Sequence, residues 1–456
     1  MFLRFFDEGL AQASFLVACG RTKEAVVVDP RRDIDIYVAA ARQHGLSIVY
    51  AIETHIHADF VSGARELAAT GTRPVAGPGA GLSFPHHEAQ DHEHLRVGDI
   101  DLELLHTPGH TPEHITIVVR EPGQPVRALT GDLLFVGAVG RPDLLGSDQA
   151  RALAHDLHRS LFDIMLPLPD DVEVHPGHGA GSLCGAGIGK EPYSTIGRER
   201  QSNPMLQHRS VEAFVAAVLA DLPETPPYFP RMKRVNHDGP AVLGLVEPVE
   251  APPPIGARAV ASALAANGVV LDLRSSEEYG AGHVTNAIHI AFGSKVGYWA
   301  GWVIEPGTRV ILVISDERQA VEVRRQLLRV GIDAVDGVLR GDRADWQADG
   351  LLISATPQIT VRELETKRHG PEAVTVLDVR SAREWKSGHI NGAVNIPVGE
   401  VPVRMRELQT GGPVAVICEG GFRSSLASSL LERAGVSVIQ NVTGGMAAYR
   451  SLELTR

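Results

Sequence analysis

Three scarcities limit what this sequence can encode. Only 3 of its 456 residues are cysteine, too few and an odd number for a disulfide framework, so an important cysteine is expected to act chemically in a reducing compartment. No run of about 18 or more apolar residues is present, which argues against a membrane-spanning helix. Lys and Arg number 43 against 55 Asp and Glu, an acidic balance that disfavours nucleic acid and anionic membranes as partners.

The N-terminus also lacks the long apolar core of a signal peptide. Residues 1–7 mix apolar, basic and acidic side chains, so we expect an unsecreted, cytoplasmic protein. Hydrophobic residues make up 44% and charged residues 21% of the chain, the balance of an ordinary globular protein. The length is too great for a single core and suggests about three domains.

Proline clusters and an internal repeat divide the chain. The clusters are PPYFP and APPPIG, and α/β alternation precedes them. Beyond them, LDLRSSEEYGAGHVTNAIHI (271–290) and LDVRSAREWKSGHINGAVNI (377–396) match in register, 106 residues apart. Each repeat fits a small α/β domain of about 100 residues. We predict three domains: residues 1–252, a first copy of the repeated domain (253–352) and a second copy (353–456).

Four motifs carrying His or Asp lie at predicted strand ends of the first domain. They are THIHADF (54–60), HTPGHTPEH (106–114), TGDLLF (130–135) and HPGHG (175–179). Side chains at i and i+2 of an extended segment point the same way, so His55 and His57 can face one cation. Neutral imidazole and carboxylate are natural ligands for zinc or non-haem iron. Any one motif suits an ordinary turn, whereas four in one domain predict a metal site.

The set H-x-H-x-D, P-G-H, G-D and a late G-H resembles the metallo-β-lactamase fold over about residues 1–220. That resemblance implies an αββα sandwich with metals at one edge of its two sheets, followed here by two smaller α/β domains. Carried over by motif, the first metal position would be lined by His55, His57 and His110, both positions by Asp132, and the second position by Asp59 and His178.

Phe60 departs from the hydrolase version of this motif. That version ends H-x-H-x-D-H and uses its last histidine for the second metal, whereas phenylalanine coordinates nothing. A zinc-dependent, glyoxalase II-like thioester hydrolase therefore becomes the alternative. Persulfide dioxygenases, which the chain also resembles, are understood to hold a single Fe(II) with two histidines and an aspartate, here His55, His110 and Asp132. The groups left to orient ligands, or to bind a further ion, would be His57, Asp59 and His178.

Two further stretches, 175–203 and 226–236, resemble the version of this domain that is fused to rhodanese. The first contains Cys184, which is either a small buried hydrophobe or a thiol near the metal that carries or receives sulfur. Arg141, in GRPDL, is either structural or pairs with a substrate carboxylate. Both residues are thus candidates for a substrate or sulfur site.

VAVICEGGFRSS (414–425) delivers a cysteine from an apolar strand to a glycine loop. The glycines let backbone N–H groups turn inward, and a helix is predicted to begin near Ser424, so the loop favours an anion such as a thiolate or persulfide. Arg423 adds fixed positive charge at the rim. The pattern C-x-x-x-x-R resembles the active loop of rhodanese, in which Cys418 would accept sulfane sulfur over the anion-binding residues Glu419, Gly420, Gly421 and Phe422.

The first copy lacks this loop. Ser315 stands opposite Cys418, and Asp316 and Glu317 follow it where the second copy has glycines. Negative side chains there would oppose an anion. We therefore predict that the first copy is catalytically inactive and spaces or orients the other domains.

Taken together, the resemblances imply a persulfide dioxygenase with sulfurtransferase activity, suited to sulfide detoxification. The expected substrates are a low-molecular-weight thiol persulfide and O2, oxidised to sulfite at one Fe(II) per chain, with zinc as the alternative metal. Sulfite or thiosulfate would exchange sulfur with Cys418. A sulfur carrier or redox relay that uses only Cys418 is a third hypothesis. Neither nucleic acid nor a membrane is an expected partner, and a homo-oligomer is allowed.

Overall fold

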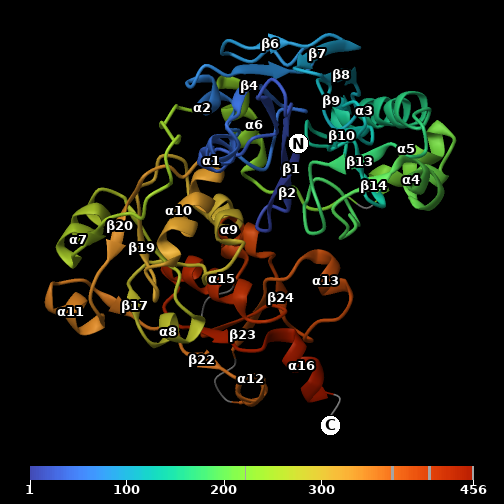
Figure 1. Cartoon of the computed structure of the whole chain (residues 1–456). Helices are drawn as coiled ribbons and strands as arrows, with labels where there is room; N and C mark the ends of the chain where they lie inside the picture. Colours follow the sequence, from blue (N-terminus) through green and yellow to red (C-terminus); the bar gives the residue numbers. More distant parts are fainter. Residues whose placement is uncertain (221, 371–373, 409–411, 454–456) are drawn as a thin grey trace. The chain divides into compact units, whose positions relative to one another are not determined.

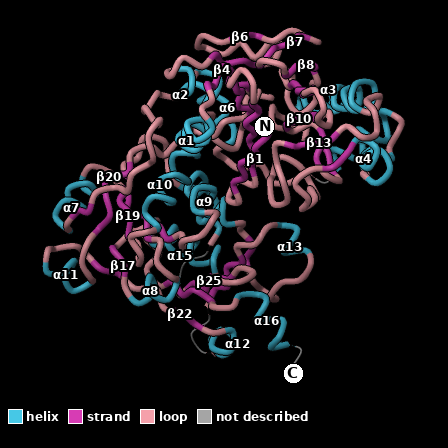
Figure 2. The backbone as a smooth tube through the Cα atoms, viewed as in Figure 1, coloured by secondary structure: helices cyan, strands magenta, loops and turns pink. Residues whose placement is uncertain are grey.

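The computed structural model describes residues 1–220, 222–370, 374–408 and 412–453 and divides into two compact units (Figure 1). The N-terminal unit comprises Met1–Val249 with Leu328–Gly331, and the C-terminal unit comprises Glu250–Leu327 with Ile332–Arg456. Helices and strands occur throughout both units (Figure 2). Across the described ranges, the helices are all too short or too polar to cross a lipid bilayer.

Two six-stranded sheets form the centre of the N-terminal unit. The first has the order β1-β2-β3-β4-β5-β6 and contains β1 (Phe2–Asp7), β2 (Gln12–Ala18), β3 (Glu24–Val28), β4 (Ser47–Ile52), β5 (Arg73–Ala76) and β6 (His87–Glu88). The second has the order β14-β13-β10-β9-β8-β7 and contains β7 (Glu93–Val97), β8 (Ile100–His106), β9 (Ile115–Arg120), β10 (Arg127–Gly131), β13 (Glu173–Pro176) and β14 (Ser194–Thr195). A small hairpin of β11 (Leu134–Phe135) and β12 (Ala138–Val139) follows β10.

Helices cover the outer face of each sheet. Tyr37 of α1 (Asp35–His44) and Leu67 of α2 (Ala64–Ala68) share a buried cluster with Val27 of the first sheet. Clustered on the second sheet are α3 (Ser147–Arg159), α4 (Ile196–Ser202) and α5 (Val211–Ala220). A last helix, α6 (Phe229–Asp238), completes the unit. This layering confirms the predicted αββα sandwich.

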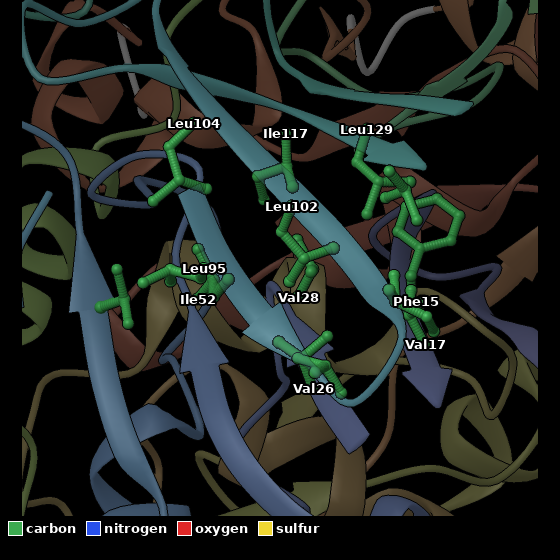
Figure 3. Close-up of a cluster of buried hydrophobic side chains, with 14 of the residues drawn as sticks. Phe15, Val17, Val26, Val28, Ile52, Leu95, Leu102, Leu104, Ile117 and Leu129 are labelled. Carbon is green, nitrogen blue, oxygen red and sulfur yellow. The ribbon is translucent and has the colours of Figure 1, made fainter. Parts of the chain in front are cut away.

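The main core of the N-terminal unit lies between its two sheets (Figure 3). Alternate residues of each strand point inward, as the period of two in a strand requires. Phe15 and Val17 of β2 face Leu102 and Leu104 of β8, and each is at most 1% exposed. Burial of such side chains stabilises the fold by about 1.5–3 kcal/mol each. The apolar filling fixes the two sheets against each other and so fixes the edge where their loops meet.

The C-terminal unit contains two parallel sheets of matching topology. The first copy has the strand order β15-β20-β19-β16-β18, and the second has β22-β26-β25-β23-β24. Elements of the first are β15 (Pro254–Ile255), α7 (Ala257–Ala265), β16 (Val269–Asp272), α8 (Ser276–Ala281), β17 (His283–Val284), β18 (Ile288–His289), α9 (Val296–Val303), β19 (Val310–Val313), α10 (Gln319–Arg329), β20 (Val335–Leu339) and α11 (Arg343–Ala348). A further strand, β21 (Ile353–Ser354), pairs with β17.

The second copy repeats this arrangement. Its elements are β22 (Gln358–Ile359), α12 (Val361–Arg368), β23 (Thr375–Asp378), α13 (Ala382–Lys386), β24 (Val394–Asn395), α14 (Val401–Arg404), β25 (Val414–Ile417), α15 (Phe422–Arg433), β26 (Ile439–Val442) and α16 (Gly445–Glu453). Arg274 pairs with Asp272, and its counterpart Arg380 pairs in the same way with Asp378. These pairs, of which only the Arg380–Asp378 pair is fully buried, support the turn after the first long strand of each copy.

Candidate functional site

Loops that follow four strands bring the predicted His and Asp residues to one edge of the N-terminal unit. His55 follows β4 of the first sheet, and His110 lies between β8 and β9 of the second. Asp132 follows β10, and His178 follows β13. Because β10 and β13 run parallel, their carboxyl ends lie at the same edge of the sheet.

His55, His110 and Asp132 form one buried group, the His–His–Asp triad. Asp132 Oδ2 lies 3.8 Å from His55 Nε2 and 3.5 Å from His110 Nε2. The two imidazole rings are perpendicular, with centroids 4.8 Å apart. Each triad residue is at most 2% exposed, and each offers a ligand atom to a common point. The geometry is that of three side chains converging on a small volume.

The hydrogen bonds of both histidines leave their Nε2 lone pairs facing the carboxylate. Thr54 Oγ1 donates to Asp29 Oδ2 at 2.9 Å, so it accepts the Nδ1 proton of His55 at 2.9 Å. His110 donates its Nδ1 proton to the carbonyl of Arg141 at 2.8 Å. Within the described residues, His55 Nε2 and the facing carboxylate oxygen have no hydrogen-bond partner. Acceptors that converge with no proton between them fit a bound cation.

The electrostatics give the triad the protonation states that a metal requires. Burial lowers the pKa of His55 well below its usual value, helped by the nearby His57, and burial also lowers the pKa of His110. Burial alone would raise the pKa of Asp132, but the charge and hydrogen bond of His178 outweigh it and hold this pKa well below its usual range. The triad therefore consists of neutral imidazoles and an ionised carboxylate, which are metal-binding forms.

His57 does not join the triad, contrary to the expectation from the H-x-H spacing. Its Nε2 lies 2.9 Å from Glu53 Oε2 and 3.2 Å from Asp29 Oδ1, and its ring packs on Phe60 with centroids 4.4 Å apart. The strand β4 ends at Ile52, so the alternation of an extended segment no longer applies at His57. Two buried carboxylates bind its Nε2, while its ring centroid lies 4.2 Å from that of His55.

His178 bridges the second metal position predicted from the motif. Its Nδ1 lies 2.7 Å from Asp132 Oδ1, and its Nε2 lies 2.9 Å from Asp59 Oδ2. Burial opposes a charge on His178, but the two carboxylates outweigh it and raise the pKa of this histidine to about 10. An imidazolium thus supplies positive charge between these carboxylates.

Cys184 lies beside the same group. Its Sγ can share a common point with ligand atoms of Asp59 and His178, while the residue packs in a buried cluster with Phe135 and Ile188. Burial raises the pKa of the Cys184 thiol well above its usual value, and the nearby carboxylates raise it further. The thiol is therefore protonated at neutral pH, and both interpretations of Cys184 stay predictions.

Arg141 makes its hydrogen bonds within the protein, and its pairing with a substrate carboxylate stays a prediction. Its guanidinium forms two 2.7 Å bonds with Asp143, and it also donates to the carbonyl of Leu183 and the hydroxyl of Thr225. The side chain is 2% exposed. With its donors used in this way, Arg141 holds in place the carbonyl that accepts the proton of His110.

The sequence did not indicate which distant residue holds the loop that follows His55. That residue is Asn236 of α6. Asn236 of α6 donates to the carbonyls of His57 and Phe60 at 2.9 and 2.7 Å, and it accepts from the N–H of Ser62 at 2.9 Å. Ser62 lies just before helix α2, which begins at Ala64. Asn236 lies in a stretch singled out for its resemblance, but nothing local indicated its partner.

Ile56, the residue between the two motif histidines, is held through both of its backbone polar groups. Glu113 accepts from the N–H of Ile56 at 2.9 Å, and Lys233 lies 3.5 Å from its carbonyl oxygen. Lys233 also lies close enough to lower the pKa values of His55 and His110 through its charge. A cationic side chain therefore stands next to the triad.

Two glycines let the chain approach closely enough to form the triad. Gly109, with φ of +151°, would place a Cβ 2.4 Å from Leu157 Cα, and it directly precedes His110. Gly131, with φ of +46°, would place a Cβ 2.5 Å from Thr54 Oγ1, and it directly precedes Asp132. At both positions a side chain would push a ligand loop away from its support.

The second candidate site is the cysteine loop of the C-terminal unit. Cys418 follows β25 and is 1% exposed. The N–H of Gly421 points at its Sγ from 3.1 Å, and Ser424 Oγ lies 3.5 Å away. The helix α15 begins at Phe422, two residues before the predicted start. An inward-facing N–H and a helix N-terminus surround the sulfur, as an anion-binding loop requires.

Arg423 is held at the rim of this loop by a carboxylate. It forms two 2.7 Å bonds with Glu384 of α13. The same Glu384 completes a capping box with Ser381. The hydrogen bond from Arg423 leads the causes that lower the pKa of Glu384 to about 2. The positive charge of Arg423 is thus partly offset in this structure.

In the first copy, the residue at the place of Cys418 is Ile314, one before the predicted Ser315, because Val313 and Ile417 pair with the equivalent aspartates of the two copies. Ser315 Oγ donates to Glu278 at 3.1 Å, and Glu278 is the repeat counterpart of Glu384. Asp316 pairs with Arg318 at the surface. The inactivity of this copy stays a prediction.

Comparison with known proteins places both halves of the chain. The metallo-beta-lactamase superfamily matches residues 7–178, and the rhodanese-like domain matches residues 257–349 and 360–452. The mitochondrial persulfide dioxygenase ETHE1 of Homo sapiens is 31% identical over 219 residues, which cover 46% of this chain and 78% of that protein. The chain belongs to the metallo-beta-lactamase superfamily. In this superfamily member, two rhodanese-like domains follow the metal-binding fold, which confirms the predicted fusion.

Two more relatives of this superfamily member illustrate its range. The hydroxyacylglutathione hydrolase GloC of Haemophilus influenzae is 29% identical over 210 residues, covering 41% of this chain and 90% of that protein. A crystal structure of a metallo-beta-lactamase from Staphylococcus aureus is 33% identical, with a TM-score of 0.65, and covers 75% of this chain and 99% of that chain. The superfamily member is therefore an enzyme with a candidate metal site, and its family includes both oxygenases and hydrolases.

Replacing Gly109 with alanine should weaken metal binding by about tenfold to 100-fold, the usual effect of disturbing groups that orient metal ligands. The added Cβ would meet the backbone at Leu157 and displace the loop of His110. The measurement is metal content after equilibration with a competing chelator. Gly20→Ala is the matched control, because a Cβ there has no atom within 4 Å. Equal metal content in the two variants would contradict the argument.

Replacing Glu384 with glutamine should speed the reaction of Cys418 with anionic reagents by about two- to fivefold, because the charge of Arg423 is no longer offset. We would compare alkylation of the Cys418 peptide by iodoacetate with alkylation by neutral iodoacetamide, using mass spectrometry. The ratio of the two rate constants should rise. Glu363→Gln, which alters another capping-box glutamate of the same copy, should leave that ratio unchanged. A ratio that rises equally in both variants would refute the role given to Glu384.

Proposed function

We propose that the chain is a persulfide dioxygenase coupled to a sulfurtransferase. The observation that carries this proposal is the buried convergence of His55 Nε2, His110 Nε2 and Asp132 Oδ2. Among the described residues, neither His55 Nε2 nor Asp132 Oδ2 has a hydrogen-bond partner. Two histidines and one carboxylate are the ligand set of non-haem iron that works with O2. The resemblance to persulfide dioxygenases supports the same assignment.

A single Fe(II) would be held by the triad and would supply the binding of O2 and of a persulfide sulfur at its open positions. A thiol persulfide, O2 and water would give a thiol, sulfite and two protons. The chain's own part is to keep both Nε2 lone pairs directed at the ion, through Thr54 and the carbonyl of Arg141. The buried setting would exclude bulk water from the reacting sulfur.

Two features support one metal ion rather than two. Phe60 removes the histidine that a second ion would need, and its ring packs on His57 instead. His178 places both ring nitrogens against one oxygen each of Asp132 and Asp59 and so holds these two atoms with an imidazole. Under this proposal His57, Asp59 and His178 orient the ligands. Cys184 would be the thiol that meets sulfur released at the triad.

Cys418 would carry out the sulfurtransferase step. Its thiolate would attack the sulfane sulfur of a persulfide or of thiosulfate, and the S–S bond would break to release a thiol or sulfite. The N–H groups of the loop 419–422, with Arg423 at the rim, would stabilise the resulting Cys418 persulfide anion. The reverse step would return this sulfur to sulfite as thiosulfate. Linking both sites in one chain raises the effective concentration of a shared intermediate.

The alternative is a zinc-dependent thioester hydrolase with a rhodanese tail. The similarity to hydroxyacylglutathione hydrolase GloC favours it, since that protein matches over 90% of its length. Phe60 counts against a two-zinc site. Under the dioxygenase proposal, the protein works in the cytoplasm. Its reacting partners are a thiol persulfide, O2, sulfite and thiosulfate.

The dioxygenase is tested by oxygen uptake. Protein loaded anaerobically with Fe(II) should consume O2 when glutathione persulfide is added, and sulfite should accumulate in equal amount. The zinc-loaded protein should neither consume O2 nor hydrolyse S-lactoylglutathione. Thioester hydrolysis on zinc together with no oxygen uptake on iron would replace the dioxygenase by the hydrolase.

The two proposed activities should separate by mutation. His110→Ala removes one of three ligands and should lower oxygen uptake by at least about 100-fold, the upper range for damaged metal sites, while leaving thiosulfate-to-cyanide sulfur transfer intact. Cys418→Ser should abolish the transfer and leave initial oxygen uptake unchanged. Loss of both activities in either single variant would show that the sites do not work independently.

A further inference from the structure

Helix α15, which begins beside Cys418, carries a polar stripe that the first copy binds. The stripe consists of Ser425 and the residues four, seven and eight positions after it, which lie along one face of the helix: Ser429, Glu432 and Arg433. Such spacing places side chains on a single side of a helix. Ser425 and Ser429 are at most 1% exposed, although serine is usually found at the surface. Both copies belong to the same compact unit.

His289 of β18 makes the contact nearest to the cysteine loop. Its Nδ1 lies 2.8 Å from Ser425 Oγ, and its backbone N–H donates to Ser429 Oγ at 3.1 Å. Its Nε2 lies 2.9 Å from the carbonyl of Arg274. Because a carbonyl only accepts, Nε2 carries the proton and Nδ1 accepts the hydroxyl proton of Ser425. One histidine thus links a strand end of the first copy to the first turn of α15.

Further contacts hold the other end of the helix. Glu432 accepts from His283 Nε2 at 2.7 Å and from the N–H of Asn286 at 3.2 Å. Arg433 donates to the carbonyl of Asn286 at 2.6 Å. The helix is therefore bound to the first copy along its length, which limits how it can shift.

The internal repeat provides a direct comparison for His289. Its counterpart in the second copy is Asn395, 106 residues later. Asn395 donates to the carbonyl of Arg380, the counterpart of Arg274, and to the carbonyl of Asp378, both at 2.9 Å. Asparagine therefore makes the bond inside its own copy, whereas histidine makes that bond and also reaches the helix. The contact with the helix is therefore made only by the histidine of the first copy.

The first turn of α15 is part of the cysteine loop itself. Ser425 directly follows Ser424, whose Oγ lies 3.5 Å from Cys418 Sγ and donates to the carbonyl of Gly421 at 3.0 Å. The N–H of Gly421 in turn points at the sulfur. A second contact from the first copy falls on the same turn, where Trp299 meets Phe422 with ring centroids 6.4 Å apart.

We propose that the cysteine-less first copy is a positioning domain for Cys418, and that His289, acting through Ser425, fixes the first turn of α15 and hence the N–H groups that face the sulfur. His289 touches neither the sulfur nor any substrate, so it is a positioning residue. A loop built to hold an anion works only while its N–H groups keep their direction, since the benefit comes from preorganisation. This inference extends the proposed role of Cys418 and does not depend on the dioxygenase.

The test replaces His289 with the residue that the other copy uses. His289→Asn should keep the bond to the carbonyl of Arg274 and lose the one to Ser425. We expect the rate of alkylation of Cys418 by iodoacetamide at pH 7, followed on its peptide in the full chain, to fall about fivefold, the equivalent of one ordinary hydrogen bond. Thiosulfate-to-cyanide transfer should fall by the same factor, and oxygen uptake should not change.

A double-mutant cycle separates positioning from general destabilisation. Ser425→Ala alone should lower the alkylation rate by a similar factor, and adding His289→Asn to it should cause no further loss. His369→Asn, the same exchange at an exposed histidine of the second copy, should be without effect. Equal rates in wild type and His289→Asn, or losses that multiply in the double variant, would overturn the positioning role. A wild-type Cys418 no more reactive than free cysteine would overturn both this role and the sulfurtransferase function.

Discussion

The N-terminal site depends on one electrostatic constraint: three buried acceptor atoms converge on a point and repel one another unless a cation lies between them. The surroundings maintain this unfavourable arrangement. Thr54 and the carbonyl of Arg141 fix the protons of His55 and His110 on the outer side of each ring. Asp132 is charged because His178 neutralises its other oxygen. Holding these acceptors together therefore lowers the stability of the fold, and a bound metal ion would offset that loss.

The features of the N-terminal unit that could be predicted from the sequence are those encoded by residues close together in the chain. Motifs at strand ends are local, so the sandwich, the repeated domain and the convergence of His55, His110 and Asp132 could all be expected. The supports are distant in the chain: Asp29 is 25 residues from Thr54, and Asn236 is 179 from His57. No local pattern indicates such partners. The orientation of the His57 side chain toward Glu53 and Asp29 was not predicted, because strand β4 ends before this residue.

In the cysteine loop, too, the local features could be predicted from the sequence and the distant partner could not. Strand, cysteine, glycines and helix could be read in order because they are contiguous. The pairing of Arg423 with Glu384 could not, since 39 residues separate them and the S-x-x-E pattern around Ser381 already accounts for that glutamate as a helix cap. Long-range ion pairs of this kind adjust the charge of a site whose backbone is specified locally. The motif therefore predicts which reaction the loop would support better than it predicts how reactive Cys418 is.

The buried hydroxyl stripe of α15 has a consequence for how the repeat can evolve and be engineered. The first copy contains no cysteine, yet its residues bond polar side chains of α15 that the second copy alone would expose to water. An excised fragment of residues 353–456 would need new surface chemistry along that helix. A domain without a cysteine can thus be retained because it supports its neighbour, and a shortened protein made of the second copy alone would have to be redesigned along that helix.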